Sequence, residues 1–178
     1  FKFTTPEGPQ RELLLAVKDG LADGMNYGYD ARMLDDQVTD CAWVLKGEAE
    51  QADENLVIQG VGAIYEDLEL PLQIKVGTEG VCKFEVGDLS DFDPLLEVYF
   101  LDAALNLTTK LEAGIPVEFN LASGEYNDRF YVVFKTAEVL AIDDVDVISD
   151  NLVVFYNTAS GNINISDSSA FTAKNISL

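Results

Sequence analysis

Histidine is absent from this chain of 178 residues. Its absence excludes serine or cysteine nucleophiles that rely on a histidine base, and metal sites built on imidazole. Catalysis would have to use carboxylates, lysine or tyrosine. The chain has 32 acidic residues, so no particular pair of carboxylates stands out as a candidate for glycoside hydrolysis. We therefore expect a protein that is not an enzyme, with a carboxylate-based hydrolase as the weakest alternative.

Cysteine is also scarce, with Cys41 and Cys82 as its two occurrences. An all-cysteine zinc site needs four thiolates, and a dithiol redox motif needs two closely spaced thiols, so both are excluded. Period-two alternation places Cys41 on one strand face with Trp43, and Cys82 on one face with Phe84, so both thiols should face the core. Two alternatives stay open for them, a disulfide in an oxidising compartment or two free core thiols.

Basic residues are few, at 11 against the 32 acidic ones, and the net charge is −21. Such a charge repels nucleic acid and anionic lipid, so neither is an expected partner. A run of about 18 apolar residues, the minimum for a membrane-spanning helix, is missing as well. No N-terminal signal peptide is visible, and we expect the chain to be a piece of a longer protein. Solubility or divalent-cation binding remains as the reason for the charge.

Strand-like alternation is the dominant pattern, and 48 % of the residues are hydrophobic, enough for a sizeable core. Short strands separated by turn residues predict an all-β fold, an antiparallel β-sandwich of the jelly-roll or immunoglobulin-like kind. Residues 70–76 and 81–86 alternate on either side of a glycine-containing turn, which predicts a β-hairpin. Pro71 lacks an N–H group, so we expect its strand to be an edge strand or to be bulged.

The composition changes near residue 135. Residues 1–135 form the predicted sandwich module, and residues 136–150 form an acidic linker without a basic residue. Residues 151–178 read as short strands, too few to close a core of their own. They should therefore either dock on the first domain or be the start of a small β domain that is incomplete here.

Several segments, read in order, resemble the C-terminal β-sandwich module of cargo proteins of the type IX secretion system, which Bacteroidota-type bacteria use. They are residues 11–17 (RELLLAV), 23–31 (DGMNYGYDA), Trp43, 57–62 (VIQGVG), 70–74 (LPLQI) and 124–130 (GEYNDRF). Residues 151–178 resemble the opening strands of the type A C-terminal sorting domain that follows this module. The residues of this secretion-signal region are Asn151, Tyr156, Gly161, Ile163, Ile165, Ile176 and Leu178.

The resemblance implies export through the periplasm and outer membrane to the cell surface or medium. It implies recognition of the C-terminal domain by the outer-membrane secretion machinery, and it implies no catalytic residues in this region. The expected role is a surface spacer or part of an adhesin, in proteins of the kind that serve adhesion and gliding motility. Surface polysaccharide and other surface proteins are further expected partners.

Two binding alternatives stand beside this role. The first is calcium, which prefers six to eight oxygen ligands from closely spaced Asp and Asn residues. The candidate ligands are Asp19, Asp23, Asn26, Asp30, Asp35 and Asp36, with Asp88, Asp91 and Asp93 as a weaker second group. The other interpretation of the first group is a glycine-rich turn whose side chains cap backbone amides.

The second binding alternative is carbohydrate, held against the faces of aromatic side chains. The candidates for such a platform are Tyr27, Tyr29, Trp43, Tyr65 and Tyr99. The competing interpretation makes them core or half-buried strand residues, and the shared face of Trp43, Cys41 and Leu45 favours the core for Trp43.

Overall fold

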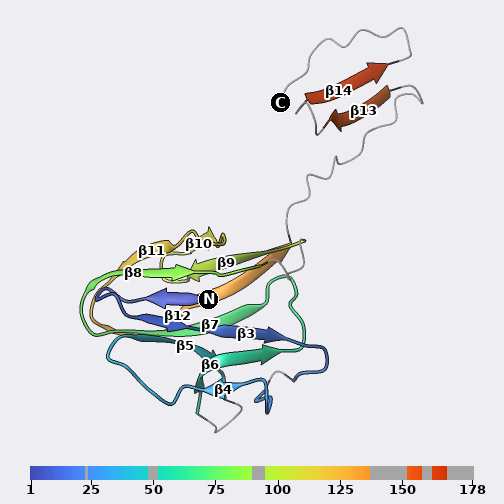
Figure 1. Ribbon diagram of the computed structural model, residues 1–178. Helices are drawn as coiled ribbons and strands as arrows, with labels where there is room; N and C mark the ends of the chain where they lie inside the picture. The colour runs from blue at the N-terminus through green and yellow to red at the C-terminus, as the bar shows by residue number, and fades with distance from the viewer. Residues whose placement is uncertain (23, 48–51, 90–94, 137–151, 158–161, 168–178) are drawn as a thin grey trace. The chain divides into compact units, whose positions relative to one another are not determined.

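Every regular element in the described part of the chain is a β-strand, which confirms the predicted all-β class (Figure 1). The structure is a computed structural model, and it describes residues 1–22, 24–47, 52–89, 95–136, 152–157 and 162–167. Within these ranges there is no helix, and hence no helix suited to crossing a membrane. The chain divides into a sandwich unit, Phe1–Ala137, and a C-terminal unit, Glu138–Leu178. The division falls inside the segment 136–150.

The sandwich unit contains two sheets. The larger has the strand order β10-β9-β12-β7-β5-β6-β3, with β4 also paired to β6. Its strands are β3 (Leu14–Val17), β4 (Ala31–Arg32), β5 (Asp40–Leu45), β6 (Glu54–Val61), β7 (Glu69–Val76), β9 (Leu96–Asp102), β10 (Leu107–Lys110) and β12 (Gly124–Thr136). The smaller has the order β11-β8-β1-β2. Its strands are β1 (Lys2–Thr4), β2 (Gln10–Glu12), β8 (Gly80–Glu85) and β11 (Val117–Leu121). All pairings are antiparallel except β3 with β6.

Aromatic rings from both sheets fill part of the space between them. Phe100 of β9 stacks on Phe84 of β8 and on Phe119 of β11, with ring centroids 5.0 Å apart in each case. Phe130 of β12 lies 5.4 Å from Phe100 in a nearly parallel orientation. Because these rings come from opposite sheets, they join the two layers into one core.

Residues 11–17, whose apolar pattern suggests a single strand, form parts of two strands in different sheets. β2 ends at Glu12 in the smaller sheet, and β3 begins at Leu14 in the larger sheet. Leu13 lies between them and is buried. The chain therefore crosses from one layer to the other at Leu13, a change of direction that side-chain periodicity does not reveal.

The predicted hairpin of residues 70–76 with 81–86 is wrong. β7 pairs with β5 and β12, whereas β8 pairs with β1 and β11 in the other sheet. The connection between them is an arch over the core, and Gly77 lies so close to Val38 that a Cβ atom there would stand 2.4 Å from its Cγ1. Both strands do bury alternate residues, but an arch and a hairpin produce the same alternation when each strand faces a shared core.

Pro71 does not lie on an edge strand, because β7 has a neighbour on each side. Its pairing with β5 extends only to Trp43 opposite Leu72, so Pro71 is paired on the β12 side alone, with Tyr131. A register shift occurs nearby in β12, between Tyr126 and Phe130. The missing N–H of Pro71 thus coincides with the place where β5 and β7 stop pairing.

The C-terminal unit contains an antiparallel pair, β13 (Leu152–Asn157) and β14 (Asn162–Asp167). Tyr156 pairs with Ile163, and Ile165 pairs with Val154. The other residues of the predicted secretion-signal region lie outside the described residues: Asn151, Gly161, Ile176 and Leu178.

Candidate binding groove

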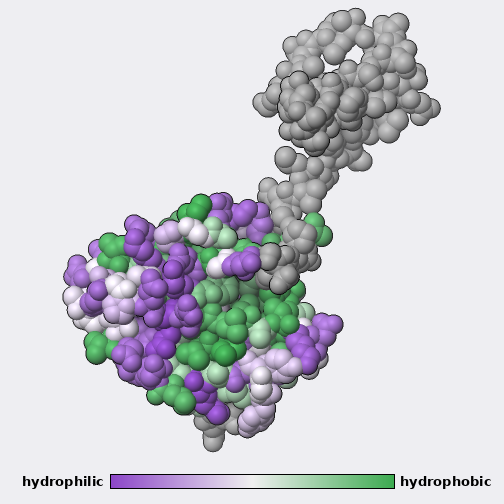
Figure 2. Space-filling view, viewed as in Figure 1, coloured by the Kyte–Doolittle hydropathy of each residue, from purple (hydrophilic) through white to green (hydrophobic). Residues whose placement is uncertain are grey.

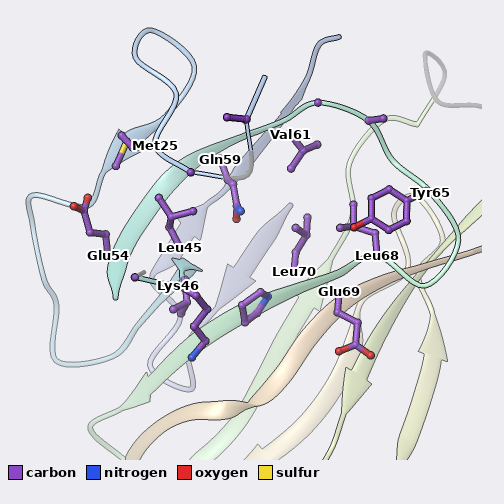
Figure 3. Close-up of a pocket in the computed structure, with 18 of the residues that line it drawn as sticks. Met25, Leu45, Lys46, Glu54, Gln59, Val61, Tyr65, Leu68, Glu69 and Leu70 are labelled. Atoms are coloured by element: carbon purple, nitrogen blue, oxygen red, sulfur yellow. The ribbon is translucent and has the colours of Figure 1, made fainter. Parts of the chain in front are cut away.

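A groove of about 1040 Å³ opens in the sandwich unit beside the ends of β5 and β7 (Figure 3). It lies where these strands no longer pair, and β6 and the loop before residue 26 border it on the other side. Its lining includes Leu45, Lys46, Gln59, Val61, Tyr65 and Leu70. The walls are mainly apolar, and polar side chains stand at the base and the rim.

The loop between β3 and β4 forms one wall, and Asn26 and Asp30 hold it in place. The Nδ2 group of Asn26 donates to the carbonyl oxygens of Ala22 and Gly24, both at 2.9 Å, and more weakly to that of Gly60 at 3.4 Å. Asp30 accepts from the backbone N–H groups of Asn26 and Gly60. These bonds attach the loop to β6, so the wall has a defined position.

Glycines in β6 and just after it let the loop approach closely. A Cβ atom on Gly60 would lie 2.9 Å from the Cβ of Tyr29, and one on Gly62 would lie 2.6 Å from the carbonyl oxygen of Leu21. A larger residue at either position would push the loop outwards. The glycines of the segment 57–62 therefore shape the groove wall.

Gln59 is the buried polar residue of the groove. It is 7 % exposed, and its Oε1 atom is buried without a hydrogen-bond partner in the described structure. Figure 3 shows its side chain directed from β6 into the space near Leu45. A buried polar atom without a partner destabilises the folded state by about 1–3 kcal/mol, so a hydrogen bond from a ligand to this amide would recover part of that free energy.

The rim carries one aromatic ring and several charges. Tyr65 is 60 % exposed. Lys46 is held by Asp53 and Asp128 at 3.0 and 2.9 Å. Glu69 makes no ion pair or side-chain hydrogen bond within the described residues and points away from the apolar wall in Figure 3. The rim therefore offers a ring face and a carboxylate to a ligand.

Another carboxylate of the groove wall, Glu54, is engaged by Arg32, whose Nη2 lies 3.0 Å from Oε1. These hydrogen bonds lower the pKa of Glu54, so the group stays ionised at neutral pH. A glycosidase general acid needs the opposite shift. The pKa values of Asp40, Asp53, Glu97 and Asp102 are lowered as well.

Four of the six residues predicted to bind calcium have other partners in the structure. Asn26 and Asp30 bind backbone groups, Asp35 pairs with Arg11 at 3.3 Å, and Asp36 pairs with Lys75 at 2.7 Å. Asp19 lies at the groove, apart from these pairs. Asp23 lies outside the described residues. Of the second group, Asp91 and Asp93 also lie outside them, whereas Asp88 lies within them.

Within the described ranges, no three His, Cys, Asp or Glu side chains are grouped as metal ligands would be. At Asn26 and Asp30 the structure has the alternative arrangement, a turn whose side chains cap backbone amides. Calcium binding stays a prediction.

The predicted aromatic platform is not assembled. Trp43 is fully buried, as its shared face with Cys41 favours, and its Nε1 donates to the carbonyl oxygen of Leu14 at 3.0 Å. Tyr27 is 90 % exposed on the loop, and the ring of Tyr29 lies against Lys18. Among the five candidates, Tyr65 is the one that lines the groove.

Both cysteines face the same core, as predicted, and both are free and buried. Burial raises the pKa of the Cys82 thiol to about 11, and burial raises the pKa of Cys41 well above its usual value. Of the two alternatives for these residues, the structure has the free core thiols.

A second apolar surface lies over β3, where hydrophobic residues gather in Figure 2. Leu14 and Val17 there are 56 % and 50 % exposed, and a shallower hollow of about 650 Å³ adjoins Phe1. It has no unpaired polar side chain comparable to Gln59 among the described residues. The groove is therefore the better candidate site.

Comparison of the chain with protein-family models, with curated proteins and with solved structures found no match. The functional argument consequently depends on the groove itself. Sequence reasoning missed Gln59, because one glutamine between apolar residues and glycines carries no signal of burial. The two glycines that follow it, Gly60 and Gly62, are the signal that could have indicated a close backbone approach.

Proposed function

We propose that this chain is a non-catalytic extracellular module of a type IX secretion cargo, with a binding role served by the groove. The observation that carries the binding role is Gln59, whose buried Oε1 has no partner in a groove that the exposed ring of Tyr65 also lines. Ligand sites in proteins combine apolar walls with a few placed polar groups in this way. The spacer or adhesin role follows, since such a module connects the secreted protein to a surface.

The non-catalytic part of the proposal is supported by the state of the carboxyl groups. Glu54 at the groove is ionised and held by Arg32. A general acid would have to stay protonated at neutral pH, which requires a raised pKa. Incubation of the chain with soluble polysaccharides should therefore release no reducing ends above the background of a heat-denatured sample, and steady release would contradict this part.

The secretion part is supported by the resemblance of residues 151–178 to a sorting domain and by the antiparallel pairing of β13 with β14. Its test is a chimera, in which residues 151–178 replace the opening strands of a complete type A sorting domain fused to a fluorescent reporter. Export to the surface or medium should be retained in a type IX-competent strain. A chimera with the same residues in scrambled order should leave the reporter in the periplasm, and equal retention of both would contradict the assignment.

A further inference from the structure

We infer that the groove binds a neutral oligosaccharide, with one sugar ring against Tyr65 and a sugar hydroxyl on the amide of Gln59. This inference rests on the proposed binding role of the groove and names its ligand class. The groove is about 1040 Å³. That volume exceeds what a single small metabolite needs and accommodates several linked sugar rings.

The hydrogen-bonding state of Gln59 favours hydroxyl groups as partners. The amide makes no hydrogen bond in the described structure, and its Oε1 is buried. A half-turn of the amide exchanges its oxygen and nitrogen, so either group can be presented to the groove. A hydroxyl both donates and accepts, and it can therefore satisfy the amide in either orientation. A purely apolar ligand would leave Gln59 unpaired.

Tyr65 supplies the second element of sugar recognition. Its ring is 60 % exposed and stands at the rim of the groove beside the apolar side chains of Leu68 and Leu70. A pyranose presents C–H groups on its faces and hydroxyls around its edge. A ring that is apolar on its face and polar at its tip matches this distribution, because it can contact the C–H groups and leave the edge hydroxyls free to hydrogen-bond.

The charge of the molecule selects against anionic glycans. The net charge is −21, and the groove itself carries Asp19 and Glu69 without ion-pair partners in the described part of the chain. Carboxylates accept hydrogen bonds from hydroxyls but repel uronic acids and sulfated sugars. Lys46, the basic residue of the lining, is already engaged by two aspartates. The ligand is therefore an uncharged sugar chain.

The test is isothermal titration of the complete 178-residue chain with soluble neutral polymers: a β-glucan, a mannan, a xylan and an amylose fragment. Alginate serves as the anionic comparison, and Nile red with a lysine-rich peptide covers the apolar and cationic ligands. Tyr65→Ala should weaken binding of the preferred neutral polymer at least tenfold, while Tyr65→Phe should retain most of it. Tyr27→Ala is the matched control, since Tyr27 is exposed on the loop but is not one of the residues that line the groove.

Gln59→Leu, which keeps the size but removes the amide, should also weaken binding about tenfold. Circular dichroism and thermal melting confirm that each variant is folded. Three outcomes overturn the inference: no neutral polymer binds at millimolar sugar concentration, alginate binds as tightly as the neutral polymers, or Tyr65→Ala binds like the wild type. Tyr65-dependent binding of Nile red or the peptide without any sugar binding would overturn the ligand class and leave the binding role of the groove intact.

Discussion

The rings around Phe100 and the groove around Gln59 belong to one sandwich unit, yet the buried side chains of the two regions differ in whether they have partners. Phe100 contacts rings from both sheets and is 3 % exposed. Gln59 is almost as buried and has no hydrogen-bond partner. The first region fills its space for stability, and the second leaves a space and an amide unfilled. Buried polar groups without hydrogen-bond partners, in a fold that is otherwise well packed, are typical of ligand-binding sites.

The largest expected effect comes from removing a ring of the aromatic cluster around Phe100. Phe100→Ala removes the ring that bridges both sheets and should lower the free energy of unfolding by about 3–5 kcal/mol. Tyr65→Ala at the groove rim should lower it by less than about 1 kcal/mol, because its ring is 60 % exposed. Urea unfolding followed by tryptophan fluorescence measures both, since Trp43 is buried in the core. Similar losses for the two variants would show that the groove ring is structural.

The second prediction compares how much the free energy of unfolding falls when each of two arginine–carboxylate pairs is broken. Asp40 has a side chain 4 % exposed and accepts from Nε and Nη2 of Arg11, each at 2.7 Å. Asp40→Ala would leave the largely buried arginine with the longer contact to the exposed Asp35 as its ion pair, and should lower the free energy of unfolding by about 2–4 kcal/mol. Glu54→Ala breaks the pair with Arg32 at the groove, where both side chains are more exposed, and should lower it by about 0–1 kcal/mol.

Equal losses for Asp40→Ala and Glu54→Ala would contradict this difference in burial. Chemical unfolding at neutral pH and moderate salt is the appropriate measurement, because salt screens the exposed pair more than the buried one.

The pair of Asp40 and Arg11 also makes the stability depend on pH. Burial alone raises the pKa of Asp40, but hydrogen bonds from Arg11, from Gln37 N–H and from Cys41 N–H outweigh it, and the pKa is lowered from the usual 3.8. The stabilisation is therefore fully present above the unfolded-state pKa and is lost as the pH falls through the folded-state pKa. The stability difference between the wild type and Asp40→Asn should shrink as the pH decreases below 3.8. A difference that stays constant to pH 2 would show that the Asp40 carboxylate contributes nothing as an ion.

Much of the filled region could be predicted from the sequence, and little of the groove could. Alternation correctly identified the core side of β7 and the burial of Trp43, because period-two burial depends only on the local chain. The partner of each strand depends on where the chain turns. At Leu13 and Gly77 the chain changes sheets, and at these points the predicted single strand and hairpin were wrong.

The groove depends on distant segments meeting. Asn26 and Asp30 reach Gly60 across about 30 residues of sequence, at separations of 34 and 30. Their residue types suggested calcium ligands, since short oxygen-bearing side chains serve both as metal ligands and as caps of backbone amides. Composition does not distinguish these uses, whereas the hydrogen bonds to β6 assign these two side chains to the loop.

The smallest expected effect is the one that separates stability from binding. Gln59→Leu replaces an unpaired buried amide by an apolar group of similar size, so it should raise the free energy of unfolding by about 0.5–1.5 kcal/mol. The same substitution should weaken sugar binding, because the hydroxyl loses its partner. Thermal melting and titration of one preparation measure both quantities. If the role of Gln59 were purely structural, the substitution would break its hydrogen bonds and lower the free energy of unfolding. A gain in stability together with a loss of binding is the pattern expected where a fold retains an unsatisfied group for a ligand.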